Sequence, residues 1–222
     1  MKNTIKQPSL WVYLSAILLP LNGGLINVIT LMSFLHNSVG YVTGNISNAS
    51  IYLHDDDLIL FCRMILLILF FLFGAVTSSL ITCRERFEKD IRYVFIILIQ
   101  LICITVAIIL LRLEKQYSDF VLAFLMGAQN AMTTHYGTAI IRTTHMTGTT
   151  TDLGISIARW LKYRDEPVWK IKLYLVLILS FIGGSILGAI LFRYYGVNVV
   201  FISILIYLIL LAKYYLRKLT NG

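Results

Sequence analysis

Long runs of hydrophobic residues alternate with short polar segments along most of this chain. A helix needs roughly 20 mostly apolar residues to cross the hydrocarbon core of a bilayer. Six stretches meet that condition, at residues 10–35, 58–82, 91–111, 120–141, 173–192 and 197–215. The pattern predicts an all-α integral membrane protein with six transmembrane helices, which form one membrane domain over residues 1–222.

Two polar phrases that contain glycine interrupt this apolar pattern. YVTGNISNASIY covers residues 41–52, and HMTGTTTDLGIS covers residues 145–156. Gly44 and Gly148 lie 104 positions apart, and Asn27 and Asn130, which precede the phrases, lie 103 positions apart. These nearly equal offsets indicate an internal duplication, with repeat one at residues 10–111 and repeat two at residues 119–216.

The duplication extends beyond the two phrases. FGAVTSS at residues 73–79 corresponds to GGSILGA at residues 183–189, and both segments carry small residues at the spacing that lets helices pack closely in lipid. Three spanning helices per repeat is an odd number, so the second repeat would enter the membrane upside down. Inverted repeats are typical of many secondary transporters, which bind their substrate between the repeats. The alternative is four crossings per repeat, which would make the repeats parallel.

Charge separates these two topologies. Only 14% of the residues are charged and 58% are hydrophobic, which favours lipid as the solvent, while the net charge is +8. Six spans with the N-terminus inside place 15 Lys and Arg residues inside and three outside, whereas eight spans give 12 and six. The positive-inside rule therefore favours inverted repeats with both termini in the cytoplasm. It also explains the basic charge without a nucleic-acid partner.

Each polar phrase is too polar to face lipid. Backbone at membrane depth must be hydrogen-bonded or must line a protected cavity. We expect each phrase to be a break, with glycine allowing a turn, followed by a short helix at residues 46–53 and 150–161. If these helices begin near the membrane centre, their free N–H groups and positive dipole ends face a central cavity.

Several of these segments resemble a known family. GLIN before YVTGN, then GAQNAM, then RTTHMTGTTTDLGI at residues 142–155 resemble the YoaK-like membrane proteins, a bacterial family of small six-span proteins of unknown function. The resemblance covers most of the chain and implies a multi-pass protein of the bacterial plasma membrane. It implies no substrate or reaction. Family members often carry a histidine before the first TGN motif, as His145 precedes the second phrase, but the place near Tyr41 lacks one.

Asp152 is the acidic residue of the second phrase. Residues 149–152 have the spacing of a capping box, and residues 45–48 are a weaker analogue. Asp152 would then cap a helix. The alternative is a carboxylate at the membrane centre that binds a cation or a proton and pairs with Arg142 or Arg159.

The 120–141 window is the most polar of the six. Polar side chains in lipid need partners and usually face the bundle interior. They either bind the two halves together or line a path for a solute or an ion. His135 or His145 could relay protons near neutral pH. The polar residues of this window are Gln129, Asn130, Thr133, Thr134, His135, Tyr136 and Thr138.

One cationic residue and one acidic loop complete the candidate chemistry. Arg63 lies inside a window, where it would snorkel to the outer face or pair with residues 55–57. His54 and the three following aspartates could bind a divalent cation, but we expect an outer loop in which Asp57 caps the helix beginning at Leu58. The chain has no GxSxG, HExxH, P-loop or GxGxxG motif. We therefore expect no enzyme, no cofactor and no metal site.

The leading functional hypothesis is transport of a small solute or ion between the two repeats. The alternatives are a non-transporting scaffold or assembly partner and, less favoured, a small intramembrane enzyme. The expected partners are the lipid bilayer, an unidentified solute or ion and a second copy of the chain. The candidate binding residues are Asn27, Thr43, Gly44, Asn45, Asn48, Gln129, Asn130, His145, Thr147, Gly148 and Asp152.

Overall fold

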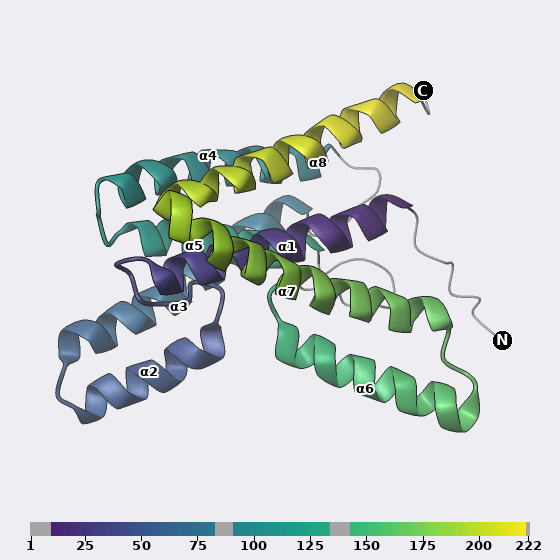
Figure 1. The fold of residues 1–222 in the computed structure, drawn as a ribbon, viewed down its shortest axis with the longest axis horizontal. Helices are drawn as coiled ribbons and strands as arrows, with labels where there is room; N and C mark the ends of the chain where they lie inside the picture. The colour runs from purple at the N-terminus through teal and green to yellow at the C-terminus, as the bar shows by residue number, and fades with distance from the viewer. Residues whose placement is uncertain (1–9, 83–90, 134–142, 221–222) are drawn as a thin grey trace.

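The computed structural model describes residues 10–82, 91–133 and 143–220, and their regular secondary structure is helical throughout (Figure 1). This confirms the predicted all-α architecture. In chain order the elements are α1 (Leu10–Met32), α2 (Val42–His54), α3 (Leu58–Thr82), α4 (Arg92–Arg112), α5 (Ser118–Thr133), α6 (Met146–Tyr163), α7 (Val168–Tyr195), the 3-10 helix η1 (Gly196–Val200) and α8 (Phe201–Thr220).

Within the described residues, four stretches are long and apolar enough to cross a membrane. They are Val12–Met32 in α1, Leu58–Thr82 in α3, Arg92–Arg112 in α4 and Val168–Leu216, which contains α7, η1 and α8. Large apolar side chains on α3 and α7 point outward, which would be costly in water. These features are compatible with a membrane protein. Helix α5 has 16 described residues, and the rest of the 120–141 window lies outside the described residues.

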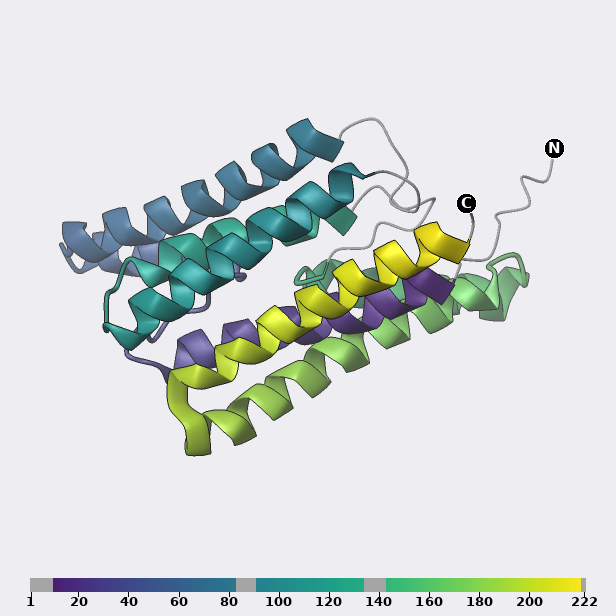
Figure 2. The ribbon, with the colours of Figure 1, turned by 90° about the horizontal axis from the view of Figure 1, so that it is seen from above.

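The long helices form two groups (Figure 2). Helices α3 and α4 lie with α5, and α7 and α8 lie with α1, so each half of the chain contributes its first helix to the other half's group. The most extensive helix contacts join α1 to α7 and α3 to α5. Along the long axis of the molecule, α1 and α7 run in one direction and α3 and α5 in the opposite direction (Figure 1).

Glycines allow the close approach of α3 to α5. A Cβ atom on Gly74 would overlap the carbonyl oxygen of Phe124, and one on Gly127 would overlap the carbonyl oxygen of Phe71. The two backbones therefore touch without intervening side chains. The small residues at 73–79 act within this chain as contacts between its two halves.

The contact between α1 and α7 repeats this arrangement. A Cβ atom on Gly184 would overlap the carbonyl oxygen of Leu21, and one on Gly24 would overlap the carbonyl oxygen of Phe181. Gly184 holds the place in the segment 183–189 that Gly74 holds in the segment 73–79. The sequence correspondence between these segments is therefore matched by corresponding contacts.

Helices α2 and α6 are shorter and pack mainly on α3 and α7, respectively. Each begins near the middle of the molecule, and they run toward opposite ends (Figure 1). The predicted starts at residues 46 and 150 are wrong, because the helices begin four residues earlier, at Val42 and Met146. The break in the first half is the non-helical segment 33–41, which precedes the glycine of the phrase.

An aspartate side chain makes a polar contact in the turn at each end of the molecule. At one end, the Leu60 N–H donates to Asp57 Oδ1 at 2.9 Å, which confirms Asp57 as the cap of α3. At the other end, Arg159 Nη2 lies 2.8 Å from Asp165 Oδ2, in the turn between α6 and α7. The hydrogen bond from Arg159 lowers the pKa of the Asp165 carboxyl from its ordinary value.

Adjacent glycines in α7 test the importance of the close crossing. Gly184→Ala should lower the thermal midpoint of the purified protein and cost about 1–3 kcal/mol, because the new methyl group overlaps the α1 backbone. Gly183 has nothing within 4 Å of its Cβ position, so Gly183→Ala should stay within about 1 kcal/mol of the parent. Equal losses of stability in the two variants would contradict this account.

Candidate functional site

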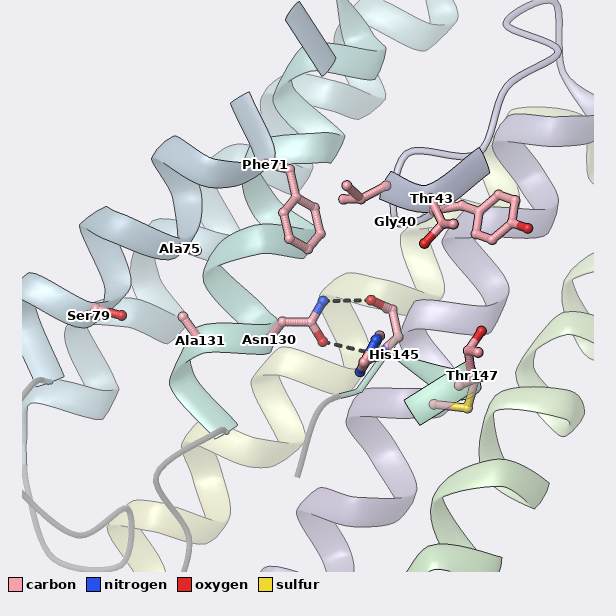
Figure 3. Close-up of a pocket in the computed structure, with 13 residues that line it drawn as sticks. Gly40, Thr43, Phe71, Ala75, Ser79, Asn130, Ala131, His145 and Thr147 are labelled. Carbon is pink, nitrogen blue, oxygen red and sulfur yellow. Dashed lines mark hydrogen bonds between the residues drawn. The ribbon is translucent and has the colours of Figure 1, made fainter. Parts of the chain in front are cut away.

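A cavity of about 500 Å³ lies where α2 and α6 begin (Figure 3). Residues 40–43 from the first half and residues 144–147 from the second half line it. These two segments correspond at the offset of 104 that relates the two glycines of the phrases. The remaining lining residues come from α3 and α5, and they are Phe71, Ala75, Ser79, Asn130 and Ala131.

The side chain of Asn130 holds the chain in place just before α6. Its Oδ1 atom accepts hydrogen bonds from the backbone N–H groups of Thr143, at 2.8 Å, and Thr144, at 3.0 Å. Its Nδ2 atom donates to the Thr144 hydroxyl at 2.5 Å (Figure 3). A non-helical backbone inside an apolar layer needs such acceptors, so this side chain fixes where the second half enters the cavity.

Asn27 performs the same task in the first half. Its Oδ1 atom accepts a hydrogen bond from the Gly40 N–H at 2.9 Å. The hydroxyls of Thr30 and Thr133, one turn beyond each asparagine, donate to the carbonyl oxygens of Asn27 and Asn130 at 3.0 and 3.1 Å. Both halves therefore position their polar phrases through an asparagine Oδ1 atom, which accepts from one N–H group in the first half and from two in the second.

The glycines of the two phrases make room for a neighbouring side chain and do not form a turn. Gly44 and Gly148 both lie in the first turn of a helix and have no positive φ, so the expected glycine turn is wrong. A Cβ atom on Gly148 would lie 2.5 Å from the imidazole of His145, and one on Gly44 would overlap the ring of Tyr41. Each glycine thus leaves room for the aromatic ring three residues before it.

A fully buried polar network lies beside the cavity. Gln129 Nε2 donates to the Thr143 hydroxyl at 2.8 Å and to the Leu19 carbonyl at 3.0 Å. Its Oε1 atom accepts hydrogen bonds from Asn22 Nδ2 and the Tyr207 hydroxyl, both at 2.9 Å. This network joins α1, α5 and α8, which fits the expectation that some polar residues bind the two halves together.

The candidate residues from the sequence fall into distinct places. Gly44 and Gly148 stand in the first helical turns beside the cavity, and Asn27 lies beside Gly40. Asn45 donates from Nδ2 to the Ser38 carbonyl at 3.2 Å, and Asn48 is exposed on α2. The candidates that line the cavity are Thr43, Asn130, His145 and Thr147.

The expected capping boxes are wrong. Helices α2 and α6 have Tyr41 and His145 at their N-caps, and neither start receives a side-chain cap. The Thr149 hydroxyl donates instead to the His145 carbonyl at 3.0 Å. The early helix starts explain this result, because they move residues 45–48 and 149–152 past the first turn, where backbone N–H groups already have helical acceptors.

Asp152 lies half-buried on α6, away from the cavity lining. Within the described residues it forms no hydrogen bond or ion pair. Its expected partner Arg159 pairs with Asp165, because those two residues meet at the end of the α6–α7 hairpin. Arg142 and His135, the other residues considered for ion or proton binding, lie outside the described part of the chain.

An ion pair between a half-buried arginine and a buried carboxylate joins α3 to α5 near one end of the molecule. Arg63 Nη2 lies 2.6 Å from Asp119 Oδ2, and Arg63 Nη1 donates to Gln116 Oε1 at 2.6 Å. The expected pairing of Arg63 with residues 55–57 is therefore wrong. Asp119 stands in the first turn of α5, which lies beside Arg63. Its carboxylate is therefore nearer to Arg63 than the aspartates of residues 55–57. No sequence pattern selected Asp119, because it stands at the edge of a predicted window.

Among the residues that the structure describes, the cavity lining contains no acidic side chain, lysine or arginine. Across residues 10–82, 91–133 and 143–220, no group of three His, Cys, Asp or Glu side chains is placed to hold a metal ion. The polar groups around the cavity are hydroxyls, the Asn130 amide, the His145 imidazole and the first-turn N–H groups of α2 and α6. Such a set favours a ligand that accepts hydrogen bonds.

Comparison with known proteins identifies one family. The sequence model of the family described as "Protein of unknown function (DUF1275)" matches residues 15–212. No curated protein and no solved structure matches the chain.

The role of Asn130 can be tested by truncation. Asn130→Ala should destabilise the protein by about 1–3 kcal/mol, because the Thr143 and Thr144 N–H groups lose their acceptor. Thermal unfolding in detergent measures the loss. The exposed Asn48→Ala on α2 is the matched control and should change stability by less than about 0.5 kcal/mol. An unchanged midpoint for Asn130→Ala would show that the segment before α6 is held by other contacts.

Proposed function

The chain belongs to the DUF1275 family, whose function is unknown, and we propose that it transports a small solute or ion across the bacterial plasma membrane. One observation carries this proposal. Corresponding segments from the two halves of the chain, residues 40–43 and 144–147, line a single cavity. A site built by both repeats at their interface is the arrangement found in many secondary transporters.

We propose further that the chain consists of two inverted repeats with six spanning helices. The reciprocal pairing of α1 with α7 and of α3 with α5 supports this topology. The opposite directions of α1 and α5, the first helices of the two repeats, also support it (Figure 1). In this arrangement the 16 described residues of α5 belong to the fourth span.

The proposed mechanism is alternating exposure of the cavity. Helices α2 and α6 begin near the middle of the long axis and end near opposite ends of the molecule (Figure 1). If the long axis follows the membrane normal, the cavity lies near the midplane. Rocking of the α3–α4–α5 group against the α1–α7–α8 group would then open the cavity to one side at a time.

The distribution of charged residues between the two ends of the molecule gives its proposed orientation in the membrane. The start of α1, the end of α8 and the α6–α7 turn lie at one end of the molecule (Figure 1). Arg159, Lys162 and Lys170 lie near that turn, whereas the aspartates at 55–57 lie at the other end. The positive-inside rule makes the first end cytoplasmic, together with both termini.

The alternatives have weaker support. A scaffold would need polar residues that satisfy one another, as the Gln129 network does, but it would need no cavity lined by both halves. We propose no enzymatic activity, because the lining residues that the structure describes include no carboxylate or thiol that could form a reactive pair.

Reporter insertions test the proposed topology. A periplasmic phosphatase inserted in the turn at residues 55–57 should be active, and the same enzyme inserted in the turn at residues 164–167 should be inactive. A fluorescent protein that folds only in the cytoplasm should give the reverse pattern. Phosphatase activity from both turns, or from neither, would contradict six spans with inverted repeats.

Blocking the cavity tests the transport site. Purified protein in liposomes should accelerate the entry of at least one solute class in a stopped-flow light-scattering panel of carboxylates, amino acids, sugars, nucleobases and alkali salts. Thr147→Trp should abolish that entry, because the indole fills the cavity. Thr151→Trp, one turn further along α6 and exposed, should retain it. Folded protein that accelerates no solute would overturn the proposal.

A further inference from the structure

The donors around the central cavity define a class of ligand. We propose that the cavity binds a small monovalent anion with an apolar body, of which a monocarboxylate is the simplest example. This inference rests on the proposed function, because it concerns the substrate of the same site. Four features of the cavity support it: two helix starts, an amide donor without an acceptor, an apolar wall, and the lack of acidic, lysine or arginine side chains in the described part of the lining.

Two helices begin at the cavity. Tyr41 and His145, the N-caps of α2 and α6, both line it, and neither helix start receives a side-chain cap. The first N–H groups of a helix have no acceptor within the helix. Each helix start acts as roughly half a positive charge, so the two together amount to about one. That total matches one negative charge.

The amide of Asn27 supplies an independent donor. Asn27 is 7% exposed, and its Oδ1 atom accepts from the Gly40 N–H. In the second half, Asn130 Nδ2 donates to the Thr144 hydroxyl, but Gly40 has no hydroxyl to offer in the corresponding place. Asn27 Nδ2 therefore has no acceptor among the residues that the structure describes.

This donor lies beside Gly40, which lines the cavity and leaves a notch there. A Cβ atom on Gly40 would lie 3.0 Å from Asn27 Nδ2 and 2.9 Å from Asn27 Oδ1. A ligand oxygen has to lie further from the Gly40 Cα than such a bonded atom, on the side of Nδ2, to accept a hydrogen bond from the free amide. The first half leaves open the place that the second half fills with the Thr144 hydroxyl.

The lining sets the charge of the ligand. The lining residues within 10–82, 91–133 and 143–220 include no carboxylate that would repel an anion and no lysine or arginine that would demand more than one negative charge. A cation would face two positive helix ends without a neutralising carboxylate. A divalent anion would keep about one uncompensated charge in an apolar setting, which is costly.

The opposite wall sets the body of the ligand. Phe71 and Ala75 of α3 and Ala131 of α5 face the cavity across from residues 144–147 (Figure 3). A volume of about 500 Å³ falls in the range of sites for small organic molecules. The cavity is therefore polar on the side of the helix starts and apolar on the other, as a monocarboxylate with a short hydrocarbon body requires.

Binding to charged and neutral isosteres tests the ligand class. Calorimetry on the detergent-purified full chain should detect butyrate or benzoate with a Kd at least about ten-fold lower than that of butyramide or benzamide, because a hydrogen bond to a charged acceptor is stronger than one to a neutral acceptor. Equal affinity for the amides would overturn the inference in favour of a neutral solute. Binding of neither carboxylate, or binding of alkali cations alone, would also overturn it.

Variants at the notch test its location. Asn27→Asp keeps the acceptor for the Gly40 N–H but replaces the free donor with a carboxylate oxygen, so carboxylate affinity should fall at least about ten-fold. Gly40→Ser fills the notch and gives Asn27 a hydroxyl partner, so it should also weaken binding. Ser50→Asp adds the same charge at an exposed position on α2 outside the lining and should bind as the parent does.

The outcomes separate this inference from the proposed function. Parental affinity in folded Asn27→Asp overturns the inference, and if that variant fails to fold, parental affinity in Gly40→Ser overturns it instead. Carboxylate binding without uptake into proteoliposomes would overturn transport and leave the ligand class standing. Uptake of a neutral solute without carboxylate binding would overturn the ligand class alone.

Discussion

Backbone that leaves a helix inside an apolar layer must find hydrogen-bond partners, and the rest of this structure depends on how two asparagines meet that need. Asn27 and Asn130 each accept from backbone N–H groups of the segment that returns to the middle of the molecule. Without these acceptors the N–H groups would carry a desolvation cost that lipid cannot relieve. The asparagines therefore determine where α2 and α6 begin.

The helix crossings place these asparagines. Asn27 lies on α1 one turn beyond Gly24, and Asn130 lies on α5 one turn beyond Gly127, at the contacts with α7 and α3. Lipid supplies little hydrophobic drive for helices to associate, so close backbone packing has to hold these crossings. Because each crossing joins helices from different halves, the two polar phrases meet at one cavity.

Much of this arrangement could be predicted from the sequence, because it depends on patterns within short segments of the chain. Apolar windows identified the helices, and the offsets between Asn27 and Asn130 and between the two TG phrases identified corresponding positions. The partners across the fold could not be predicted in this way. Tyr207 and Asn22 reach Gln129 only because α8 and α1 pack beside α5, and Arg63 meets Asp119 only because α3 and α5 run side by side. The sequence pattern identified Gly44 and Gly148 as special positions, but it did not predict their contact with the Tyr41 and His145 rings. That contact depends on where α2 and α6 begin, and the capping patterns predicted these starts four residues too far along the chain.

The differences between the halves are as informative as their likeness. The place of the Arg63–Asp119 pair corresponds, in the second crossing, to Leu173 and Ala16, which pack in a small apolar cluster. Breaking a buried ion pair strands a charge, whereas apolar side chains that separate in lipid exchange one apolar contact for another. Under the proposed function, the ion pair therefore stiffens one end of the α3–α4–α5 group, and the α1–α7–α8 group lacks this polar contact at the corresponding place. Two groups with the same backbone plan would then differ in rigidity on the two sides of the cavity.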